Sequence, residues 1–363
     1  MKNELKIGGL KIPIPIIQGG MGVGISLSGL ASAVANEGGV GVISAAGLGF
    51  VHRFPALDYR QANIEGLKKE IRKAREHTKG IIGVNIMVAM SNFADLVRTS
   101  IAENIDIIFS GAGLPFELPK FLTPGSSTKL VPIVSSGRAA RIICEKWKSY
   151  HDYLPDAFVV EGPRAGGHLG FKKENLDDTQ YALEELVPEV VREVKFFEDK
   201  YHCEIPVIAA GGIYTGQDIF NIMQKGAKGV QLGTRFVTTT ECDASPRFKQ
   251  TYIDAAESDM EIIQSPVGMP GRAIHNQFLD KVRSGLKIPL KCPFQCIKTC
   301  DVSSSPYCII TALLNAYKGN MKSGYAFAGA NAFLATKITS VKEIFSELLE
   351  EWKAAQLSLK KSC

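Results

Sequence analysis

The chain has 363 residues, of which 45% are hydrophobic and 22% are charged, and this composition excludes a disordered, collagen-like or coiled-coil protein. The formal net charge of +5 comes from 42 Lys and Arg against 37 Asp and Glu. It is too small to indicate a nucleic-acid-binding protein, which usually carries a dense basic stripe. No apolar run approaches the ~20 residues of a membrane span. The opening residues, MKNELK, lack the apolar segment of a secretory signal, so a cytoplasmic protein without membrane contact is expected.

Short apolar runs, each followed by a helical stretch, recur through the first two thirds of the chain. They are apolar without alternation, as expected for parallel strands that are buried on both faces. The runs are Ile14–Gly19, Val40–Ala45, Ile81–Ile86, Asp106–Gly111, Leu130–Ser136, Ala157–Gly162, Pro206–Gly212 and Gly229–Thr234. Eight such units predict an α/β fold, a (β/α)8 TIM barrel, with an open doubly wound sheet as the alternative. In a barrel the active site lies where the strands end.

The first run ends in a glycine-rich loop that reads QGGMGVG from Gln18 to Gly24. Its glycines would let the backbone lie flat against a planar ligand, with Met21 on the ring of that ligand. The alternative is a flexible loop. The third run ends at Asn85, whose amide would either hydrogen-bond a heterocycle at the barrel mouth or cap a turn.

A single histidine follows the sixth run, in the segment VEGPRAGGHLG from Val160 to Gly170. Its position after a strand places His168 on the face where barrel enzymes carry out chemistry. Flanking glycines leave the ring accessible, and an imidazole titrates near neutral pH, which suits a general acid or base. A lone histidine is more often structural, and the other five histidines of the chain are interpreted so.

The seventh and eighth runs both end in glycine, at Gly211-Gly212 and at Gly233-Thr234. Barrels commonly bind phosphate at these two strand ends, on backbone N–H groups. The glycines would let the backbone approach a phosphate, and Thr234 would donate a hydrogen bond from its hydroxyl. The alternative is that these glycines only make tight turns.

The repeating pattern stops near Cys242, so a barrel domain over residues 1–242 is expected, and the proline-rich segment 243–325 predicts a cap domain inserted after strand eight. The cap contains four cysteines within a short stretch: Cys292, Cys296, Cys300 and Cys308. In a protein without an export signal, such a cluster indicates a metal site rather than disulfides. Four thiolates suit a tetrahedral zinc or a [4Fe–4S] cluster.

Basic residues are also concentrated in the cap. Between residues 272 and 298 a single acid, Asp280, stands among six basic residues, which are Arg272, Lys281, Arg283, Lys287, Lys291 and Lys298. This stretch is either a solvated face or a docking surface for an acidic partner.

The last segment, 326–363, is expected to form a helix that packs on the barrel. Ser340 and Glu343 have the spacing of a capping box. Apolar residues then recur at helical spacing and form one face. They are Val341, Ile344, Phe345, Leu348, Leu349 and Trp352.

Taken together, these motifs resemble those of the nitronate monooxygenase and FabK-type enoyl-ACP reductase superfamily. The resemblance covers nearly the whole chain, in order, through Gln18–Gly22, Gly83–Asn85, Glu161–His168, Ala209–Ile213 and Gln231–Arg235. It implies an FMN-dependent barrel with His168 as the catalytic acid/base. It also implies a set of cofactor-binding residues: Met21, Gly22 and Asn85 at the flavin ring; Gly211, Gly212, Gly233 and Thr234 at the phosphate, with Gln231 nearby; and Glu161, Gly166 and Gly167 in the same site.

The cysteine spacing departs from the simpler members of that superfamily and looks like FabX-type proteins, which carry FMN and an iron–sulfur cluster. This implies that the four cysteines bind a [4Fe–4S] cluster, with zinc as the alternative, because a redox cluster near a flavin has an electron-transfer partner. It further implies an acyl-ACP dehydrogenase/isomerase of unsaturated fatty acid biosynthesis. Such an enzyme would convert saturated medium-chain acyl-ACP to trans-2- and then cis-3-enoyl-ACP. Acyl carrier protein would be its partner, and oxygen or the cluster would reoxidise the flavin.

Three other functions stay open. The sequence also leaves open the acyl length and the oligomeric state, for which a homodimer is one possibility. The first is an NAD(P)H-dependent enoyl-ACP reductase, which runs the reaction in the opposite direction. The second is a nitronate monooxygenase, in which His168 would deprotonate a small nitroalkane. The third is a non-catalytic flavin- and cluster-binding redox sensor, and an accessible histidine after strand six argues against it.

Overall fold

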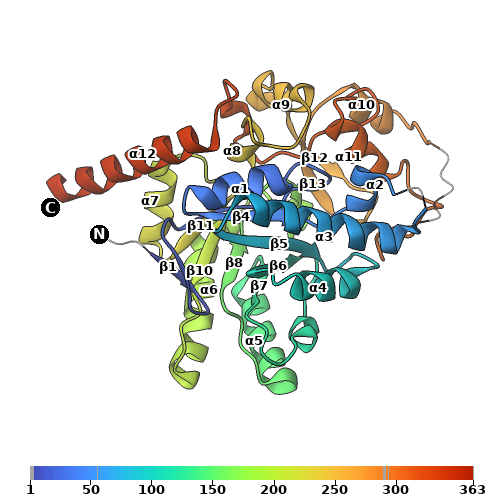
Figure 1. Cartoon of the computed structure of the whole chain (residues 1–363). Coiled ribbons are helices and arrows are strands. Elements are labelled where there is room, and N and C mark those ends of the chain that lie inside the picture. The colour runs from blue at the N-terminus through green and yellow to red at the C-terminus, as the bar shows by residue number, and fades with distance from the viewer. Residues whose placement is uncertain (1–3, 55, 289–291, 293, 363) are drawn as a thin grey trace.

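The computed structural model describes residues 4–54, 56–288, 292 and 294–362. At its centre is a closed barrel of parallel strands in the order β10-β11-β3-β4-β5-β6-β7-β8 (Figure 1). The strands are β3 (Ile16–Gln18), β4 (Val40–Ser44), β5 (Ile81–Met87), β6 (Ile107–Gly111), β7 (Lys129–Val134), β8 (Phe158–Glu161), β10 (Val207–Ala210) and β11 (Gly229–Leu232). The predicted (β/α)8 TIM barrel is therefore confirmed, and each predicted run contains one strand or overlaps it.

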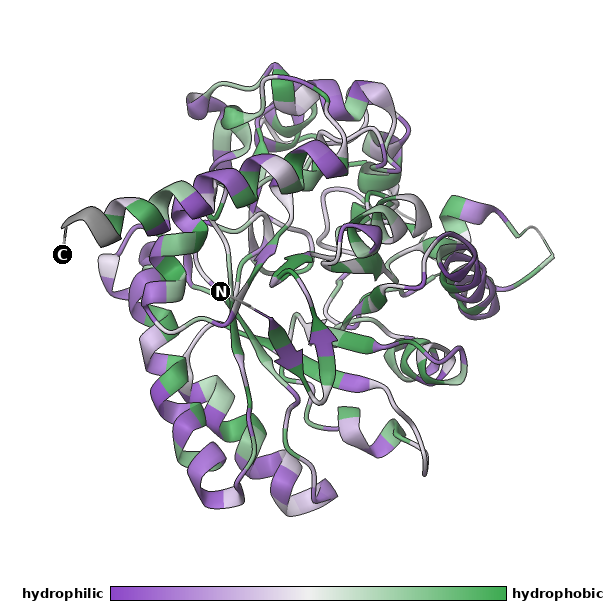
Figure 2. Ribbon diagram, turned by 60° about the vertical axis from the view of Figure 1, so that its left-hand side comes forward, coloured by the Kyte–Doolittle hydropathy of each residue, from purple (hydrophilic) through white to green (hydrophobic). Residues whose placement is uncertain are grey.

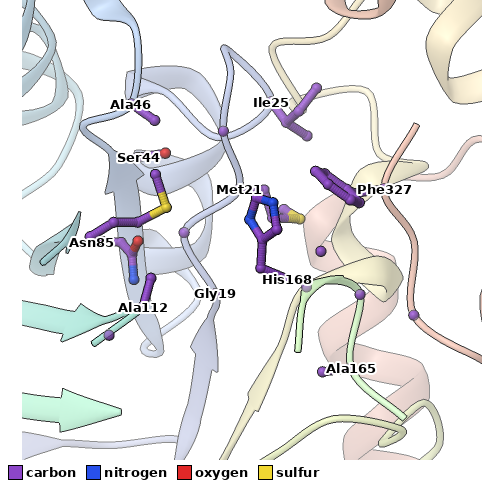
Figure 3. Close-up of a pocket in the computed structure, with 18 of the residues that line it drawn as sticks. Gly19, Met21, Ile25, Ser44, Ala46, Asn85, Ala112, Ala165, His168 and Phe327 are labelled. Atoms are coloured by element: carbon purple, nitrogen blue, oxygen red, sulfur yellow. The ribbon is translucent and has the colours of Figure 1, made fainter. Parts of the chain in front are cut away.

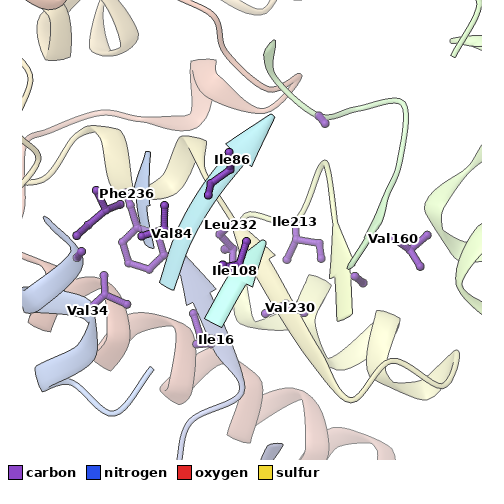
Figure 4. Close-up of a cluster of buried hydrophobic side chains, with 14 of the residues drawn as sticks. Ile16, Val34, Val84, Ile86, Ile108, Val160, Ile213, Val230, Leu232 and Phe236 are labelled. Carbon is purple, nitrogen blue, oxygen red and sulfur yellow. The ribbon is translucent and has the colours of Figure 1, made fainter. Parts of the chain in front are cut away.

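Helices surround the barrel and bury the outer side chains of its strands. These helices are α1 (Ser28–Asn36), α2 (Leu48–His52), α3 (Tyr59–His77), α4 (Phe93–Ala102), α5 (Gly137–His151), α6 (Leu183–Tyr201), α7 (Gly216–Gln224) and α8 (Thr234–Val237). Figure 4 shows this layer, where Ile16, Val84 and Ile108 of the strands lie in one cluster with Val34 of α1 and Phe236 of α8. The helices show alternating hydrophilic and hydrophobic bands in Figure 2, as expected when only one face is buried.

The side chain of Gln18 links two barrel strands where the backbone pairing is short. β3 and β4 pair only at Ile17 and Val40. The Gln18 amide donates to the Val42 carbonyl at 3.2 Å and accepts from the Val42 N–H at 3.0 Å. Because Gln18 is fully buried, these bonds replace missing ladder bonds and fix the point at which the glycine-rich loop leaves the barrel.

An N-terminal hairpin that the sequence interpretation missed closes the foot of the barrel. It consists of β1 (Leu5–Ile7) and β2 (Leu10–Ile12). Its buried side chains pack with inward-facing residues such as Val42 and Phe109. The signal was present: two short alternating runs flank Gly8-Gly9, and both glycines have positive φ, as a tight hairpin turn requires.

The cap consists of α9 (Pro246–Ile253), β12 (Met260–Gln264), β13 (Pro270–Ile274), α10 (Gln277–Arg283) and α11 (Ile309–Tyr317). It lies at one end of the barrel (Figure 1). β13 pairs with both β12 and β9 (Gly167–His168), so the cap sheet includes a short strand from the barrel's sixth loop. We keep the division into 1–242, 243–325 and 326–363 as a proposal.

The C-terminal segment ends in helix α12 (Val341–Ser362), which packs against α1, α7 and α8. The predicted capping box is formed: Glu343 N donates to Ser340 Oγ at 3.1 Å, and Ser340 N donates to Glu343 Oε2 at 2.8 Å. Before this helix, residues 326–331 run beside the cap sheet, where Phe327 bridges to Ala273. In the described part of the chain, no helix combines the length and the apolar character that crossing a membrane requires.

The hairpin's contribution to folding can be measured by Ile7→Ala. Ile7 is fully buried at the foot of the barrel, so we expect the free energy of unfolding to fall by about 2–5 kcal/mol. Lys11→Ala, on the exposed face of the same hairpin, should change it by less than about 0.5 kcal/mol. Urea unfolding followed by circular dichroism compares the two variants with the parent. Equal losses in both would contradict a closing role for the hairpin.

Candidate active site

The barrel mouth and the cap form a cavity of about 320 Å³. The predicted cofactor and catalytic residues come from the ends of five barrel strands (β3, β5, β8, β10 and β11) and the loops that follow them, and the structure brings all of them to the lining of this cavity, together with one cysteine. These are Met21, Gly22, Asn85, Glu161, Gly166, Gly167, His168, Gly211, Gly212, Gln231, Gly233, Thr234 and Cys296. Cys292, Cys300 and Cys308 do not line it.

The glycine-rich loop after β3 lies directly against the ends of β4 and β5. A Cβ on Gly20 would lie 2.3 Å from Asn85 Cβ, and one on Gly22 would lie 2.9 Å from Ala46 Cβ. Only glycine allows this close approach. Met21 therefore stands above the mouth, near Gly233, where it offers an apolar surface beside the open cavity (Figure 3).

Asn85, Glu161 and Gln231 form a polar layer at the inner mouth of the barrel. Glu161 lies two residues beyond the inward-facing Val159, and successive side chains of a strand alternate between its faces. Within the described part of the chain, neither the Glu161 carboxyl nor the Asn85 amide has a side-chain hydrogen bond, although both line the cavity. Burial raises the pKa of the Glu161 carboxyl to about 7. These groups are free to bind a polar ligand.

The two predicted phosphate-binding strand ends form one cradle. Gly211 and Gly212 have φ of 95° and 92°, a conformation that favours glycine. Across from them, Thr234 Oγ1 accepts a hydrogen bond of 2.9 Å from the N–H of Gly329. The cradle therefore has a third wall, which comes from the segment just before α12.

This third wall, residues 328–331, was missed in the sequence interpretation. Asn331 donates to the Gly212 carbonyl at 2.7 Å and accepts from the Arg164 guanidinium at 2.7 Å. Arg164 N–H groups thus lie at the cavity edge beside the glycines, where they suit an anionic group. The small-residue run AGAN at Ala328–Asn331 was the available signal, but nothing in it shows that the segment returns to the barrel mouth.

His168 projects into the cavity with its ring beside Phe327 (Figure 3). β9 holds it against the cap, because His168 pairs with Gly271 of β13. Its Nε2 shares a 2.7 Å hydrogen bond with Ser265 Oγ, and its ring packs edge-on to Phe327 at 5.0 Å. Burial lowers the pKa of His168 to about 4. The imidazole is therefore neutral near pH 7, the form that accepts a proton.

One side of the cavity is apolar and runs beneath the cap. Its walls come from the loops after β3 and β5, from the β12–β13 hairpin, from residues 294–308 (the cysteine segment) and from α11. These side chains are Val23, Ile25, Met90, Val267, Met269, Ile297, Ile309, Ile310 and Leu313. Such a wall suits a hydrocarbon chain, because it removes apolar surface from water.

The four cap cysteines lie near one another without forming a metal site in this structure. Within the described residues, no three His, Cys, Asp or Glu side chains are arranged to hold a metal ion. Burial, followed by the neighbouring thiols of Cys308, Cys292 and Cys300, raises the pKa of the Cys296 thiol to about 12. Four cysteine thiols are chemically suited to bind a zinc ion or an iron–sulfur cluster. In this structure, however, they do not have the arrangement of metal ligands that the sequence predicted.

The predicted basic docking surface is smaller than the sequence indicated. Arg272 is buried, only 8% exposed, and its guanidinium donates to the Pro163 carbonyl. Arg283 pairs with Glu261, an acid that β12 brings from outside the counted stretch, and with Asp280. Arg272 therefore lies outside the expected surface, whereas Arg283 is exposed but paired with acids. The remaining basic residues divide into Lys281 and Lys287, which are exposed, Lys298, which donates to the Val88 carbonyl, and Lys291, which lies outside the described residues.

Comparisons with known proteins agree on one family. A family model described as nitronate monooxygenase matches residues 3–351. The chain is 27% identical over 271 residues to the (3aS,4S,5R,7aS)-5-hydroxy-7a-methyl-1-oxo-octahydro-1H-indene-4-carboxyl-CoA dehydrogenase of Mycobacterium tuberculosis, covering 75% of this chain and 66% of that protein. It is 28% identical over 309 residues to a probable nitronate monooxygenase of Staphylococcus aureus, covering 75% and 78%. Among solved structures, FabK from Thermotoga maritima aligns with a TM-score of 0.73 and 28% identity, over 97% of this chain and 96% of FabK.

The burial of Glu161 predicts a pH-dependent effect on stability. Since its pKa is raised from 4.5 to about 7, the stability that this carboxyl contributes is full below the ordinary pKa and is lost as the pH rises through about 7. Glu161→Gln cannot ionise. We therefore expect its melting temperature, relative to the parent, to increase between about pH 5 and about pH 8. The exposed Glu257→Gln is the control, and a pH-independent difference for Glu161→Gln would refute the burial of this charge.

Proposed function

The chain belongs to the nitronate monooxygenase family of oxidoreductases, and from this premise we propose that it is an FMN-dependent acyl-ACP dehydrogenase with isomerase activity. It would convert saturated medium-chain acyl-ACP to trans-2-enoyl-ACP and then to cis-3-enoyl-ACP, in unsaturated fatty acid biosynthesis. The observation that supports this most is the single cavity in which the glycine cradle, the neutral imidazole of His168 and an apolar wall meet.

The residues at the barrel mouth fit FMN. The cradle of Gly211, Gly212 and Thr234 would hold its one phosphate, with Arg164 adding positive charge, and no adenine-binding βαβ fingerprint occurs in the sequence. Met21, Gly22 and Asn85 would contact the ring, with Glu161, Gly166, Gly167, Gln231 and Gly233 completing the site. The chemistry that FMN supplies when bound is acceptance of hydride from the substrate Cβ.

His168 would carry the proton transfers. A thioester makes the α-proton removable, and the neutral imidazole would take it as hydride leaves Cβ. For isomerisation the same ring would remove a proton from Cγ and return one to Cα, so that the double bond moves from C2 to C3 and no atoms are gained or lost. The tight packing of Phe327 on one side of the ring would keep the imidazole directed at the cavity.

The acyl chain would lie along the apolar wall beneath the cap. The Mycobacterium tuberculosis relative is named as a dehydrogenase of a carboxyl-CoA, which supports a thioester substrate for this chain. Acyl carrier protein is acidic, and Lys281 and Lys287, two exposed lysines of the cap, would attract it by charge.

The cap cysteines would bind a [4Fe–4S] cluster, with zinc as the alternative. The support is the donor set: four cysteines in one cap segment, with Cys296 also lining the cavity. Cys296 belongs to a segment hydrogen-bonded to the barrel, since its carbonyl accepts from Ser91 N at 3.1 Å. A bound group would therefore order the loop that covers the substrate.

One alternative is favoured by a specific observation. The alignment with FabK covers almost all of both chains, which supports an NAD(P)H-dependent enoyl-ACP reductase on the same scaffold. Nitronate oxidation, the activity in the name of the Staphylococcus aureus relative, would use the same His168 without requiring the cysteines.

Anaerobic incubation with saturated acyl-ACP tests the proposed function. We expect the parent's flavin absorbance to bleach without NAD(P)H. His168→Ala should retain its flavin but bleach about 10²–10⁴-fold more slowly, because it loses the proton acceptor. The exposed His77→Ala is the matched control. Bleaching that requires NAD(P)H would favour the reductase, and oxygen-dependent turnover of nitronates alone would favour the monooxygenase.

Metal analysis tests the cysteine assignment. After anaerobic purification we expect the parent to contain iron and acid-labile sulfide in near-equal amounts, and Cys296→Ser to lose most of both, because three thiolates hold a cluster less well than four. Cys203→Ser, outside the cap, should match the parent. Zinc without sulfide would favour a zinc site over a [4Fe–4S] cluster. A protein that contains neither iron nor zinc would contradict both assignments.

A further inference from the structure

Within the described residues, Ser265 makes the one hydrogen bond of the His168 side chain. Its Oγ lies 2.7 Å from His168 Nε2, and the serine is only 3% exposed. Ser265 begins the turn that joins β12 to β13: Ser265 N donates to the Met269 carbonyl and Gly268 N donates to the Ser265 carbonyl, both at 3.0 Å. The position of this turn therefore sets the position of the imidazole.

The same turn is bonded to the cysteine segment. Thr299 Oγ1 donates to the Val267 carbonyl at 3.1 Å, and Thr299 lies between Cys296 and Cys300. Within the described residues this is the hydrogen bond that joins the cysteine segment to the turn carrying Ser265.

The cysteine segment is in turn anchored to the barrel. Lys298 N donates to the Ala89 carbonyl at 2.9 Å, Ser91 N donates to the Cys296 carbonyl at 3.1 Å, and Ile297 forms a bridge with Met90. Residues 89–91 follow β5. The segment that carries Thr299 is therefore bonded to residues 89–91 of the barrel, and Thr299 itself is bonded to the turn that contains Ser265.

We propose that Thr299 and Ser265 are positioning residues for His168, and that the cysteine segment sets the orientation of the imidazole through the contacts Thr299–Val267 and Ser265–His168. This inference rests on the proposed function in that it takes His168 as the acid/base. A displacement of about 1 Å at a reacting group can cost about 100-fold in rate. A change at Thr299 would therefore reach the proton-transfer step through Val267 and Ser265, in addition to any effect on the cavity wall that Thr299 helps to form.

Thr299→Val tests this with little change in side-chain shape. It removes the hydroxyl, so we expect kcat for dehydrogenation of acyl-ACP to fall about tenfold while KM stays within about twofold. Thr299→Ser keeps the hydroxyl and should recover kcat relative to Thr299→Val. The control is Thr251→Val, which deletes a similar hydroxyl-to-carbonyl bond of 3.2 Å to Arg247 on α9, at a position that does not line the cavity.

A second readout does not depend on turnover. The ring signals of His168 in histidine-labelled protein, one of six histidines and assigned with His168→Asn, should shift in Thr299→Val and in Ser265→Ala. They should stay in place in Thr251→Val. Unmoved His168 signals in Thr299→Val, a rise in KM at constant kcat, or a Thr299→Ser variant that behaves as Thr299→Val would each overturn the inference. If the signals shift as expected but the parent does not act on acyl thioesters, the proposed function fails and the positioning of His168 stands.

Discussion

Closure of the parallel barrel is the constraint on which the rest of this structure depends. Every strand is hydrogen-bonded on both sides, so all eight strand ends must meet at one mouth. Closure brings Met21, His168 and Thr234 to a single cavity although they lie far apart in the sequence. The ladder satisfies the backbone hydrogen bonds of the strands. The loops at the mouth can therefore contain glycines, such as Gly20 and Gly22, whose backbone lies close to neighbouring strand ends.

The cap gives this mouth its chemical character. β9 leaves the barrel to join the cap sheet, and this pairing buries His168 against Phe327 and Ser265. Burial keeps the imidazole neutral and raises the pKa of Glu161, which lines the same cavity. A base in its proton-accepting form and a carboxyl that titrates near neutral pH therefore face the same cavity, and such pairs are typical of sites where protons move.

The sequence was informative where one local pattern determines the outcome. Unbroken apolar runs identified the strands, and glycines at strand ends identified the cradle, because both patterns reflect burial and backbone geometry within a few residues. Contacts between distant segments could not be found this way. Neither the return of Gly329 and Asn331 to Thr234 and Gly212, nor the approach of Ser265 to His168, leaves a mark in the sequence near either partner. For the same reason, counting charges between residues 272 and 298 missed Glu261 of β12, which pairs with Arg283 of α10.

We propose that the glycine cradle and the inner polar layer form the binding site of a mononucleotide flavin. The most direct measurement is to release the cofactor from the purified protein by heat and to determine its mass and its amount per chain. We expect FMN in a near one-to-one ratio, and substantial loss of FMN from a Gly212→Val variant, whose added side chain would approach Arg164 Cβ at 3.0 Å in a positive-φ position. Recovery of FAD, or of no flavin from either protein, would contradict it.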